Sequence, residues 1–396
     1  MTTRPDGPDP HRATVDVYEA RGPEWEELRS PRLDEVAEFT ASLRPEDRPV
    51  ADLGCGPGWH LPDLPPGALA VDAAAAMLAL TPKYAEGSPR ARADLRALPF
   101  RGGGLGAAWA NKSYVHIDRR AVPMAWWDLH RSLRVDAPAF IGVFSGDEDH
   151  AAWEDDDFAG RSFSHWPDEL LGHVIEGAGF DVRDWVRRPE SDGVTFHGVT
   201  VRRARTLADT VGPDMRLLLV GLNPSLYAAD VGVGFARPGN RAWPALLESG
   251  LATVDRDPVA LLRHGAVGMT DLVKRATARA DELDADEFVH GLDRLDTLCE
   301  WLQPGAVCVL GITGWRAATG ERGAQVGTQD RTLGGRPVHV MPNPSGLNAR
   351  TSVADLVDHL RTALALGDHA EPDGRRSGRS TQPTTNSSDD QRGSTT

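Results

Sequence analysis

The hydrophobic positions of the first half of the chain form short runs separated by stretches with helical spacing. Strands that alternate with helices predict a mainly parallel sheet with helices on both faces. Two later runs predict an antiparallel pair that closes this sheet. The predicted strands lie at 50–53, 68–71, 106–109, 140–144, 180–182 and 195–199.

The same alternation returns in the second half, with predicted strands at 216–221, 265–269, 306–311 and 337–341. A helix is predicted to begin at Asp284, because an aspartate followed three residues later by Glu287 is a capping pattern. Apolar side chains then recur at helical spacing as far as residue 302. Another helix is predicted after Ser352.

Composition divides the 396 residues into two folded units. Residues 1–12 are polar and proline-rich, and residues 367–396 are rich in Ser, Thr, Gly, Asp and Arg, so both ends are predicted to be disordered. We predict one α/β unit at 13–205, a linker at 206–213 and a second α/β unit at 214–366. The fold class is therefore α/β, with two three-layer units.

Charge and cysteine content exclude several classes of protein. The net charge of −15 argues against a chain whose whole surface binds nucleic acid, although a local basic patch remains compatible with it. Three cysteines exclude a disulfide scaffold, an all-cysteine zinc site and a four-cysteine iron–sulfur cluster. No metal site is predicted. The absence of a long apolar segment and of a signal peptide predicts a cytoplasmic protein that contacts no membrane.

The first unit carries a glycine-rich turn after its first predicted strand. Gly54 and Gly56 alternate in Asp-Leu-Gly-Cys-Gly-Pro-Gly at 52–58, and glycine lets the backbone approach a ligand closely. Asp72 ends the next apolar run, where a carboxylate can accept hydrogen bonds from ribose hydroxyls. Asp94 and Leu95 follow, and a carboxylate and a backbone amide there are suited to the edge of an adenine.

Together these motifs resemble the class I S-adenosylmethionine-dependent methyltransferases. The resemblance implies a Rossmann-like fold and S-adenosylmethionine as cofactor, with an unknown methyl acceptor. It places six residues in the cofactor pocket: Asp52, Gly54, Gly56, Asp72, Asp94 and Leu95. The segment at 110–116 lacks the Asn/Asp-Pro-Pro-Tyr tetrad of enzymes that methylate a base's amino group. Tyr114 or His116 could act there as a general base, or each could be structural.

The second unit has two motifs directly after predicted strands, where open α/β sheets place their sites. Asn223, in Gly-Leu-Asn-Pro-Ser, cannot titrate, but its side-chain oxygen can hold and aim a water. Phe235 offers a face on which a flipped base can stack. Asn343 can hydrogen-bond a pyrimidine edge. In the same segment, Gly346, Leu347 and Asn348 could form a wedge that enters a duplex, beside Arg350 for a phosphate.

These segments, with Gly-Phe-Ala-Arg-Pro-Gly-Asn-Arg at 234–241, resemble the mismatch-specific uracil/thymine DNA glycosylase family. The resemblance implies a uracil-DNA-glycosylase-like fold with a short parallel sheet and no cofactor. It implies that Asn223 positions the attacking water, that Phe235, Asn343 and Ser345 face the base, and that the partner is duplex DNA with a G·U or G·T mismatch. An asparagine in place of an aspartate leaves no carboxylate for the sugar cation, which predicts slow chemistry.

Three positions depart from the family pattern and leave the base preference open: Ser225, Ala242 and Asp271. Other polar residues have two interpretations each, one structural and one functional. Asn240 and Arg241 either position a loop or contact phosphate, His339 is a buried histidine or a catalyst, and a basic loop is either a solvated surface or a phosphate contact. That loop contains Lys274, Arg275 and Arg279.

The sequence therefore predicts a DNA repair glycosylase fused to a methyltransferase unit. One alternative makes methyl transfer the main activity, with the glycosylase fold serving only to bind nucleic acid. A further alternative is a lesion-binding module without catalysis.

Overall fold

A computed structural model describes residues 10–30, 33–149, 151–152, 156–190, 194–346, 348 and 350–369. The predictions for residues 1–9, for Leu347 and for residues 370–396 lie outside the described residues. Two predicted boundaries need correction. Helix α1 (Pro10–Leu28) begins inside the expected leader, and α11 (Val353–His369) continues three residues past the expected end of the second unit at 366. No described helix is long and apolar enough to cross a bilayer.

In the described part of the first unit, eight strands form one sheet in the order β3-β2-β1-β4-β5-β8-β7, with β6 beside β5. The order of the strands reverses between the parallel neighbours β1 and β4, which is the switch point of a doubly wound sheet. This confirms the predicted α/β fold, including the antiparallel pairing of β7 with β8. The strands are β1 (Val50–Leu53), β2 (Leu69–Asp72), β3 (Arg90–Arg92), β4 (Ala107–Asn111), β5 (Pro138–Ser145), β6 (His165–Trp166), β7 (Phe180–Pro189) and β8 (Thr195–Arg203).

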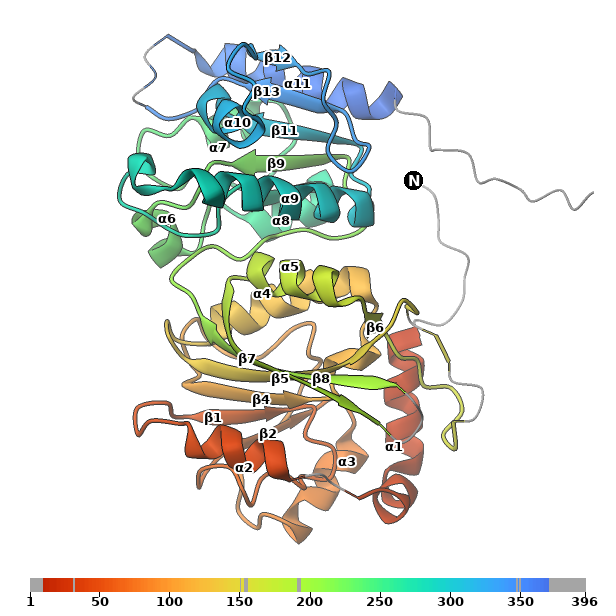
Figure 1. Ribbon diagram of the computed structural model, residues 1–396. Coiled ribbons are helices and arrows are strands. Elements are labelled where there is room, and N and C mark those ends of the chain that lie inside the picture. The colour runs from red at the N-terminus through yellow and green to blue at the C-terminus, as the bar shows by residue number, and fades with distance from the viewer. Residues whose placement is uncertain are drawn as a thin grey trace, which may run out of the picture.

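Two of these strands were not predicted. The edge strand β3 has exposed arginines at both ends, so it carries no apolar run, and β6 is only two residues long. The helices of this unit, besides α1, are α2 (Asp34–Ala41), α3 (Ala75–Leu80), α4 (Val122–Ser132) and α5 (Asp168–Gly177). Helices α4 and α5 lie between the first sheet and the second unit (Figure 1).

The second unit has a five-stranded sheet, within the described ranges, in the order β10-β9-β11-β13-β12. The four predicted strands are present and parallel, and the short β12 pairs antiparallel at the edge. The strands are β9 (Leu217–Gly221), β10 (Val267–Asp271), β11 (Ala306–Leu310), β12 (Gly327–Thr328) and β13 (Val338–Met341). The helices, besides α11, are α6 (Leu226–Val231), α7 (Ala242–Glu248), α8 (Pro258–Gly265), α9 (Ala285–Leu302) and α10 (Ile312–Thr319). Asp284 caps α9 reciprocally with Glu287, as predicted.

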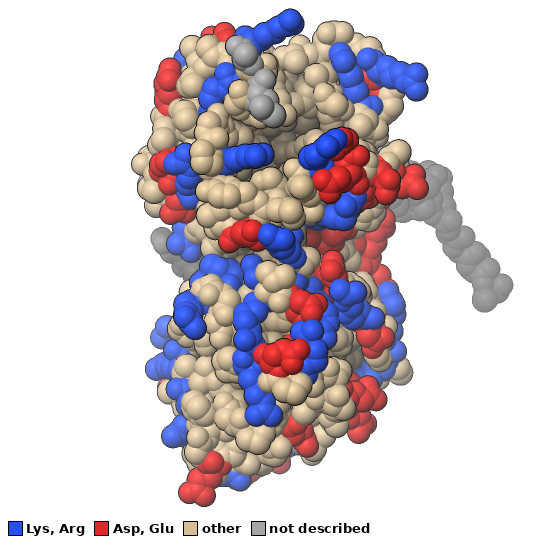
Figure 2. Space-filling model, turned by 90° about the vertical axis from the view of Figure 1, so that its left-hand side faces the viewer, with Lys and Arg blue, Asp and Glu red and all other residues tan. Residues whose placement is uncertain are grey.

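The two units stack on one another, with α5 of the first against α9 of the second (Figure 1). Seen from the side, they form two lobes joined at a waist (Figure 2). The segment predicted as a linker, 206–213, is packed rather than loose. The backbone N–H of Asp209 donates to the carbonyl of Gly177 at 2.7 Å, and Thr210 forms a β-bridge with Met269. The junction is therefore an integral part of the structure.

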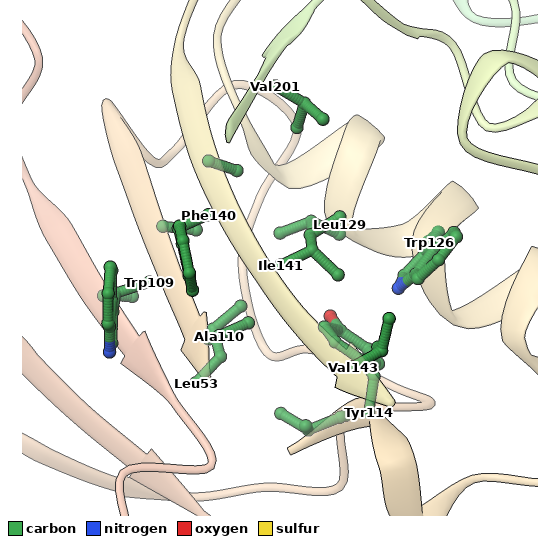
Figure 3. Close-up of a cluster of buried hydrophobic side chains, with 14 of the residues drawn as sticks. Leu53, Trp109, Ala110, Tyr114, Trp126, Leu129, Phe140, Ile141, Val143 and Val201 are labelled. Carbon is green, nitrogen blue, oxygen red and sulfur yellow. The ribbon is translucent and has the colours of Figure 1, made fainter. Parts of the chain in front are cut away.

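Each sheet has its own hydrophobic core. In the first unit, the Trp109 ring stacks on Phe140 with centroids 4.2 Å apart (Figure 3). In the second unit, alternate side chains of β9 and β11 point to opposite faces, as the two-residue period of a strand requires. Leu217 and Leu219 pack toward α7 and α11, whereas Leu218 and Val220 pack toward α9 and α10. Two buried faces explain why these strands are continuously apolar.

Candidate functional site

Asn223 follows β9 at the carboxyl end of the second sheet. Its side-chain nitrogen donates to Oγ1 of Thr277 at 2.8 Å and to the carbonyl of Arg275 at 3.0 Å. Both amide hydrogens are thus directed at the loop after β10. This orients the side-chain oxygen, an acceptor, as the atom available for a water. Ser225, one of the departures from the family pattern, caps α6 by accepting from the N–H of Ala228.

Phe235 and Asp271 both lie close to Gly221, the last residue of β9. A Cβ added to Gly221 would lie 2.3 Å from a carboxylate oxygen of Asp271 and 3.2 Å from Cζ of Phe235. Asp271 is the register partner of Gly221 on the neighbouring strand. Phe235 has a left-handed backbone (φ 58°), and its loop is held by Trp243, whose indole N–H donates to the carbonyl of Gly234 at 2.8 Å.

Asp271 is a candidate site residue that sequence reasoning missed. In the sequence, Asp271 is only a departure from the family pattern, and Asn223 in place of an aspartate predicts a site without a carboxylate for the sugar cation. The sheet register corrects this, because it brings the carboxylate of Asp271 beside the Phe235 ring. The available signal was a polar Thr-Asp pair ending an otherwise apolar strand next to β9. Burial raises the pKa of Asp271 to about 6, although Lys274 and Arg294 oppose that shift.

Behind Asp271 lies a buried ionic cluster. Asp209 accepts from Nζ of Lys274 at 2.6 Å and from Arg294 at 2.8 Å, and Thr270 donates to it at 2.6 Å. Arg294 also donates to the carbonyl of Asp271 at 2.7 Å. Burial by itself would raise the pKa of Asp209, but the two cations lower it overall. The cluster therefore holds the end of β10 in place from the junction side.

The loop after β13 is closed by Arg241. Its guanidinium donates to the carbonyls of Ser345, Asn348 and Thr351, and its backbone N–H to that of Pro344. Gly346 packs on the backbone of Gly239 so closely that a Cβ would lie 2.8 Å from its carbonyl oxygen. Arg241 is therefore a loop-positioning residue. Its neighbour Asn240 caps the N–H of Ala242 at 2.9 Å.

Asn343 is exposed at the same carboxyl edge as Asn223, with β11 between their two strands. Its side-chain oxygen accepts from the N–H of Ser345 at 2.9 Å, and its backbone carbonyl accepts from Nδ2 of Asn348 at 3.1 Å. The Asn343 amide nitrogen lies toward Gly311 at the end of β11, where a Cβ would be 3.6 Å from it. Arg350 is exposed beyond the loop. The parallel sheet thus brings Asn223, Phe235 and Asn343 to one edge.

The basic loop of the second unit is already neutralised within the protein. Lys274 is buried on Asp209, Arg275 pairs with Glu287 at 2.7 Å, and Arg279 pairs with Asp281. Lys274 in particular cannot reach a phosphate. His339 is also structural, because Nε2 lies 2.9 Å from Nδ1 of His359 and burial lowers its pKa to about 4.

In the first unit, Asp72 connects the glycine turn to β2. Its two oxygens accept from the N–H groups of Gly56 at 2.9 Å and Ala74 at 2.9 Å. Each oxygen keeps a second lone pair for a ribose hydroxyl. Burial raises the pKa of Asp72 to about 6, while these backbone donors oppose the shift. The neighbouring Asp52 is 1% exposed, and one of its carboxylate oxygens has no hydrogen-bond partner.

The two glycines of the turn serve different purposes. A Cβ on Gly54 would lie 2.3 Å from Cβ of Ser113, so this glycine permits close packing within the protein. A Cβ on Gly56 would meet only the edge of Trp25, at 3.9 Å, which leaves open space above the turn. Trp25 stacks on Trp59 with centroids 4.9 Å apart. This aromatic pair borders the turn and was not identified as a candidate from the sequence.

Asp94 and Leu95 are placed differently from each other. The Asp94 carboxylate lies 3.4 Å from Nε2 of His11 and 2.8 Å from Arg96, and its side chain stays 35% exposed. Burial would raise its pKa, but the bonds to His11 and Arg96 lower it overall. Leu95 is buried in the core, so only its backbone can meet a ligand.

Neither proposed general base of the first unit is available for catalysis. His116 accepts or donates at both ring nitrogens, 3.0 Å from the Tyr18 hydroxyl and 2.9 Å from the Ser162 carbonyl. Burial lowers its pKa to about 3, so it stays neutral. Tyr114 is fully buried, and burial raises the pKa of its hydroxyl. Both residues are structural.

A cavity of about 390 Å³ lies at the junction of the units. Charged side chains that line this cavity have partners within the protein: His290 lies 2.7 Å from Glu176, and Arg205 pairs with Asp230. A nearby group on α5 and α9, Glu169, His173 and Asp293, brings three potential metal ligands within 4.8 Å of one another. Two of the three side chains are exposed, and this group touches neither candidate site.

Comparison with known families agrees with this geometry for the second unit. Residues 208–365 match the family described as the uracil DNA glycosylase superfamily. The match spans the described site from Asn223 to the loop after β13 and does not extend into the first unit. The second unit is thus similar to the uracil DNA glycosylase superfamily over nearly its whole length, in agreement with the resemblance seen in the sequence.

Solved structures similar to this chain include S-adenosylmethionine-dependent methyltransferases. One is 1,6-didemethyltoxoflavin-N1-methyltransferase of Burkholderia thailandensis with S-adenosylhomocysteine bound, at 19% identity and TM-score 0.39, covering 51% of this chain and 93% of that one. Others come from Methanosarcina mazei (14%, TM-score 0.37, 42% and 97% covered) and Mesorhizobium loti (18%, TM-score 0.34, 43% and 100% covered). Scores this low decide nothing by themselves, and the sheet order of the first unit is the stronger evidence for its Rossmann-like fold.

Proposed function

We propose that the second unit is a DNA glycosylase that hydrolyses the N-glycosidic bond of uracil opposite guanine, with thymine or a damaged pyrimidine as further substrates. The observation that carries this proposal is the orientation of Asn223. Its amide hydrogens are held by Thr277 and Arg275, so its oxygen is the atom left to aim a water.

The chemistry follows from the groups at this edge. The bond between the sugar C1′ and the base nitrogen breaks, and its electron pair leaves with the base. The oxygen of the water held by Asn223 forms the new bond to C1′. Asp271 places negative charge near the developing sugar cation and can accept the proton that the water loses. The Phe235 ring stacks on the extruded base, whose edge meets the donors of the Asn343 loop.

The test is an excision assay with labelled duplexes that contain G·U, G·T or A·U pairs, followed by alkaline cleavage at abasic sites. Loss of the water-holding oxygen in Asn223→Ala should slow excision by about 100-fold or more, because water positioning is lost. Gln303→Asn changes an amide side chain at the opposite edge of the sheet and should leave the rate unchanged. Absence of abasic product from every duplex, with wild type and variant alike, would refute the proposal.

We further propose that the first unit binds S-adenosylmethionine, which would supply a methyl group to an acceptor. The residues fit this cofactor, since Gly56 leaves open space where a side chain would intrude and Asp72 keeps lone pairs for a ribose. One oxygen of the buried Asp52 carboxyl has no hydrogen-bond partner and is a further polar atom beneath the turn.

Calorimetric titration with S-adenosylmethionine tests this second proposal. Asp72→Asn, which removes the charge but keeps the shape, should weaken binding at least about tenfold. Asp181→Asn alters an exposed carboxylate and should bind as wild type does. Tight binding together with absence of excision would favour methyl transfer as the main activity. Duplex binding without either activity would favour a lesion-binding module.

A further inference from the structure

The first sheet presents a group of arginines at its N-terminal edge. Arg48 precedes β1, Arg101 lies in the segment before β4, and Arg134 precedes β5. The N-terminal ends of parallel strands lie at one edge, so topology brings these residues together. Arg131, at the end of α4, connects them: it donates to the carbonyl of Phe100 at 2.7 Å. We call these four residues the arginine edge.

In the described part of the chain, three of the four guanidinium groups of this edge have no carboxylate partner, whereas Arg131 pairs with Asp128. Among the described residues, no carboxylate pairs with Arg48 or Arg101, and both side chains are exposed. The Arg134 guanidinium donates only to the backbone carbonyls of Glu46 and Arg48. The acidic groups nearby have arginine partners: Asp128 pairs with Arg131, Glu46 and Asp47 pair with Arg44, and Asp136 pairs with Arg44 and Arg202.

The arginine edge continues directly from the candidate base pocket. Trp127, on α4 of the first unit, lines a small cavity together with Phe235 and Asp271 of the second. The Arg131 guanidinium carbon lies 5.9 Å from the centre of the Trp127 ring. Beside this cavity, the segment that joins the units contacts the loop after β10, where the Thr206 hydroxyl donates to the carbonyl of Lys274.

The figures show the same arrangement. The chain crosses between the units on the left of Figure 1, where α6 follows the carboxyl end of β9. That side faces the viewer in Figure 2, and Lys and Arg side chains gather on the first unit below the waist. The N-terminal edge of the first sheet and the carboxyl edge of the second thus open on one side of the molecule.

We propose that the arginine edge of the methyltransferase-like unit binds the phosphate backbone of the duplex whose extruded base enters the second unit. This inference rests on the proposed glycosylase function. A duplex engaged at the Phe235 pocket must run across the adjoining surface, and guanidinium groups without carboxylate partners are suited to phosphate. The chain has a net negative charge, and the basic residues of the second unit that the sequence suggested as phosphate contacts are paired within the protein. The arginine edge would supply the positive surface that a DNA substrate needs.

The test is fluorescence anisotropy of the full chain with a labelled duplex of about 30 base pairs, measured over a range of salt concentrations. Each lost phosphate contact lowers the slope of log Kd against log salt by about 1. Arg48→Ala with Arg101→Ala should therefore reduce the slope by about 2, and Arg48→Lys with Arg101→Lys should restore most of it. Arg12→Ala with Arg92→Ala makes the same charge change away from this edge and should leave the slope unchanged.

Single-turnover excision at saturating protein separates the two proposals. A reduced slope in the edge variant supports the arginine edge even if wild type excises no uracil, an outcome that defeats only the glycosylase proposal. If wild type excises uracil but the edge and control variants show equal slopes of log Kd against log salt, the arginine-edge proposal fails and the glycosylase proposal stands. Absence of salt-dependent duplex binding by wild type overturns it as well. Thermal melts of each variant report whether the fold is intact.

Discussion

The side-chain nitrogen of Asn223 donates to Oγ1 of Thr277 across 2.8 Å, and this bond joins residues 54 positions apart. It connects the turn after β9 to the loop after β10 and determines which way the asparagine amide faces. Thr277 is therefore a positioning residue, because it acts on the water only through Asn223.

Thr277→Val should lower the single-turnover excision rate about 2- to 12-fold, the equivalent of one net hydrogen bond of about 0.5–1.5 kcal/mol. Duplex affinity should stay unchanged, since Thr277 orients Asn223 rather than binding DNA. Thr277→Ser keeps the hydroxyl and should recover the rate. An equal loss of rate in the serine variant would show that only the methyl packing matters.

The pH dependence of excision should report Asp271. Because burial raises its pKa to about 6, the carboxylate gains its charge as pH rises through that value. If the charge stabilises the sugar cation, the rate of the wild type should rise between pH 5 and 7 and then level off. Asp271→Asn, which carries no charge at any pH, should be slower and lack this rise. A rise of the same size in the variant would assign it to another group.

Removal of Asp209 should destabilise the protein strongly. The substitution Asp209→Ala leaves Lys274 and Arg294 buried without their carboxylate, and a broken buried pair costs about 3–5 kcal/mol. Asp230→Ala breaks a solvent-exposed pair with Arg205 and should leave the stability nearly unchanged. Urea unfolding of both variants checks the difference, and similar midpoints would contradict it.

Asp52 should make the first unit less stable as pH rises. Burial and the nearby charge of Asp72 raise its pKa from 3.8 to about 8. Between these two values the folded state retains a proton that the unfolded state releases, so this contribution to stability falls as pH rises. The slope approaches about 1.4 kcal/mol per pH unit. Asp52→Asn should show a flatter decline in melting temperature from pH 5 to 8, and parallel curves would argue against the shift.

Local patterns in the sequence predicted most of the architecture. Continuous apolar runs identify β1, β9 and β13 because a strand buried on both faces needs them, and the Asp284 cap marks the start of α9 because its partner lies three residues away. Most residues of both predicted sites lie at or just after strand ends, so a parallel sheet gathers them at one edge; Phe235, which follows α6, is brought there by its loop. Polar β3 escaped prediction because an edge strand needs no apolar face.

Contacts between distant segments were decided only by the tertiary structure. Sequence suggested that Lys274 could contact phosphate, but the junction places Asp209 against it and buries both. The sequence likewise showed Asp271 only as an unusual residue, whereas the pairing of β9 with β10 sets its carboxylate beside Phe235. The sequence by itself determined the two folds and the motifs that end their strands, because periodicity and turns are local. Side-chain partners, and the arginine edge beside the base pocket, depend on register and on how the units pack, which no local pattern encodes.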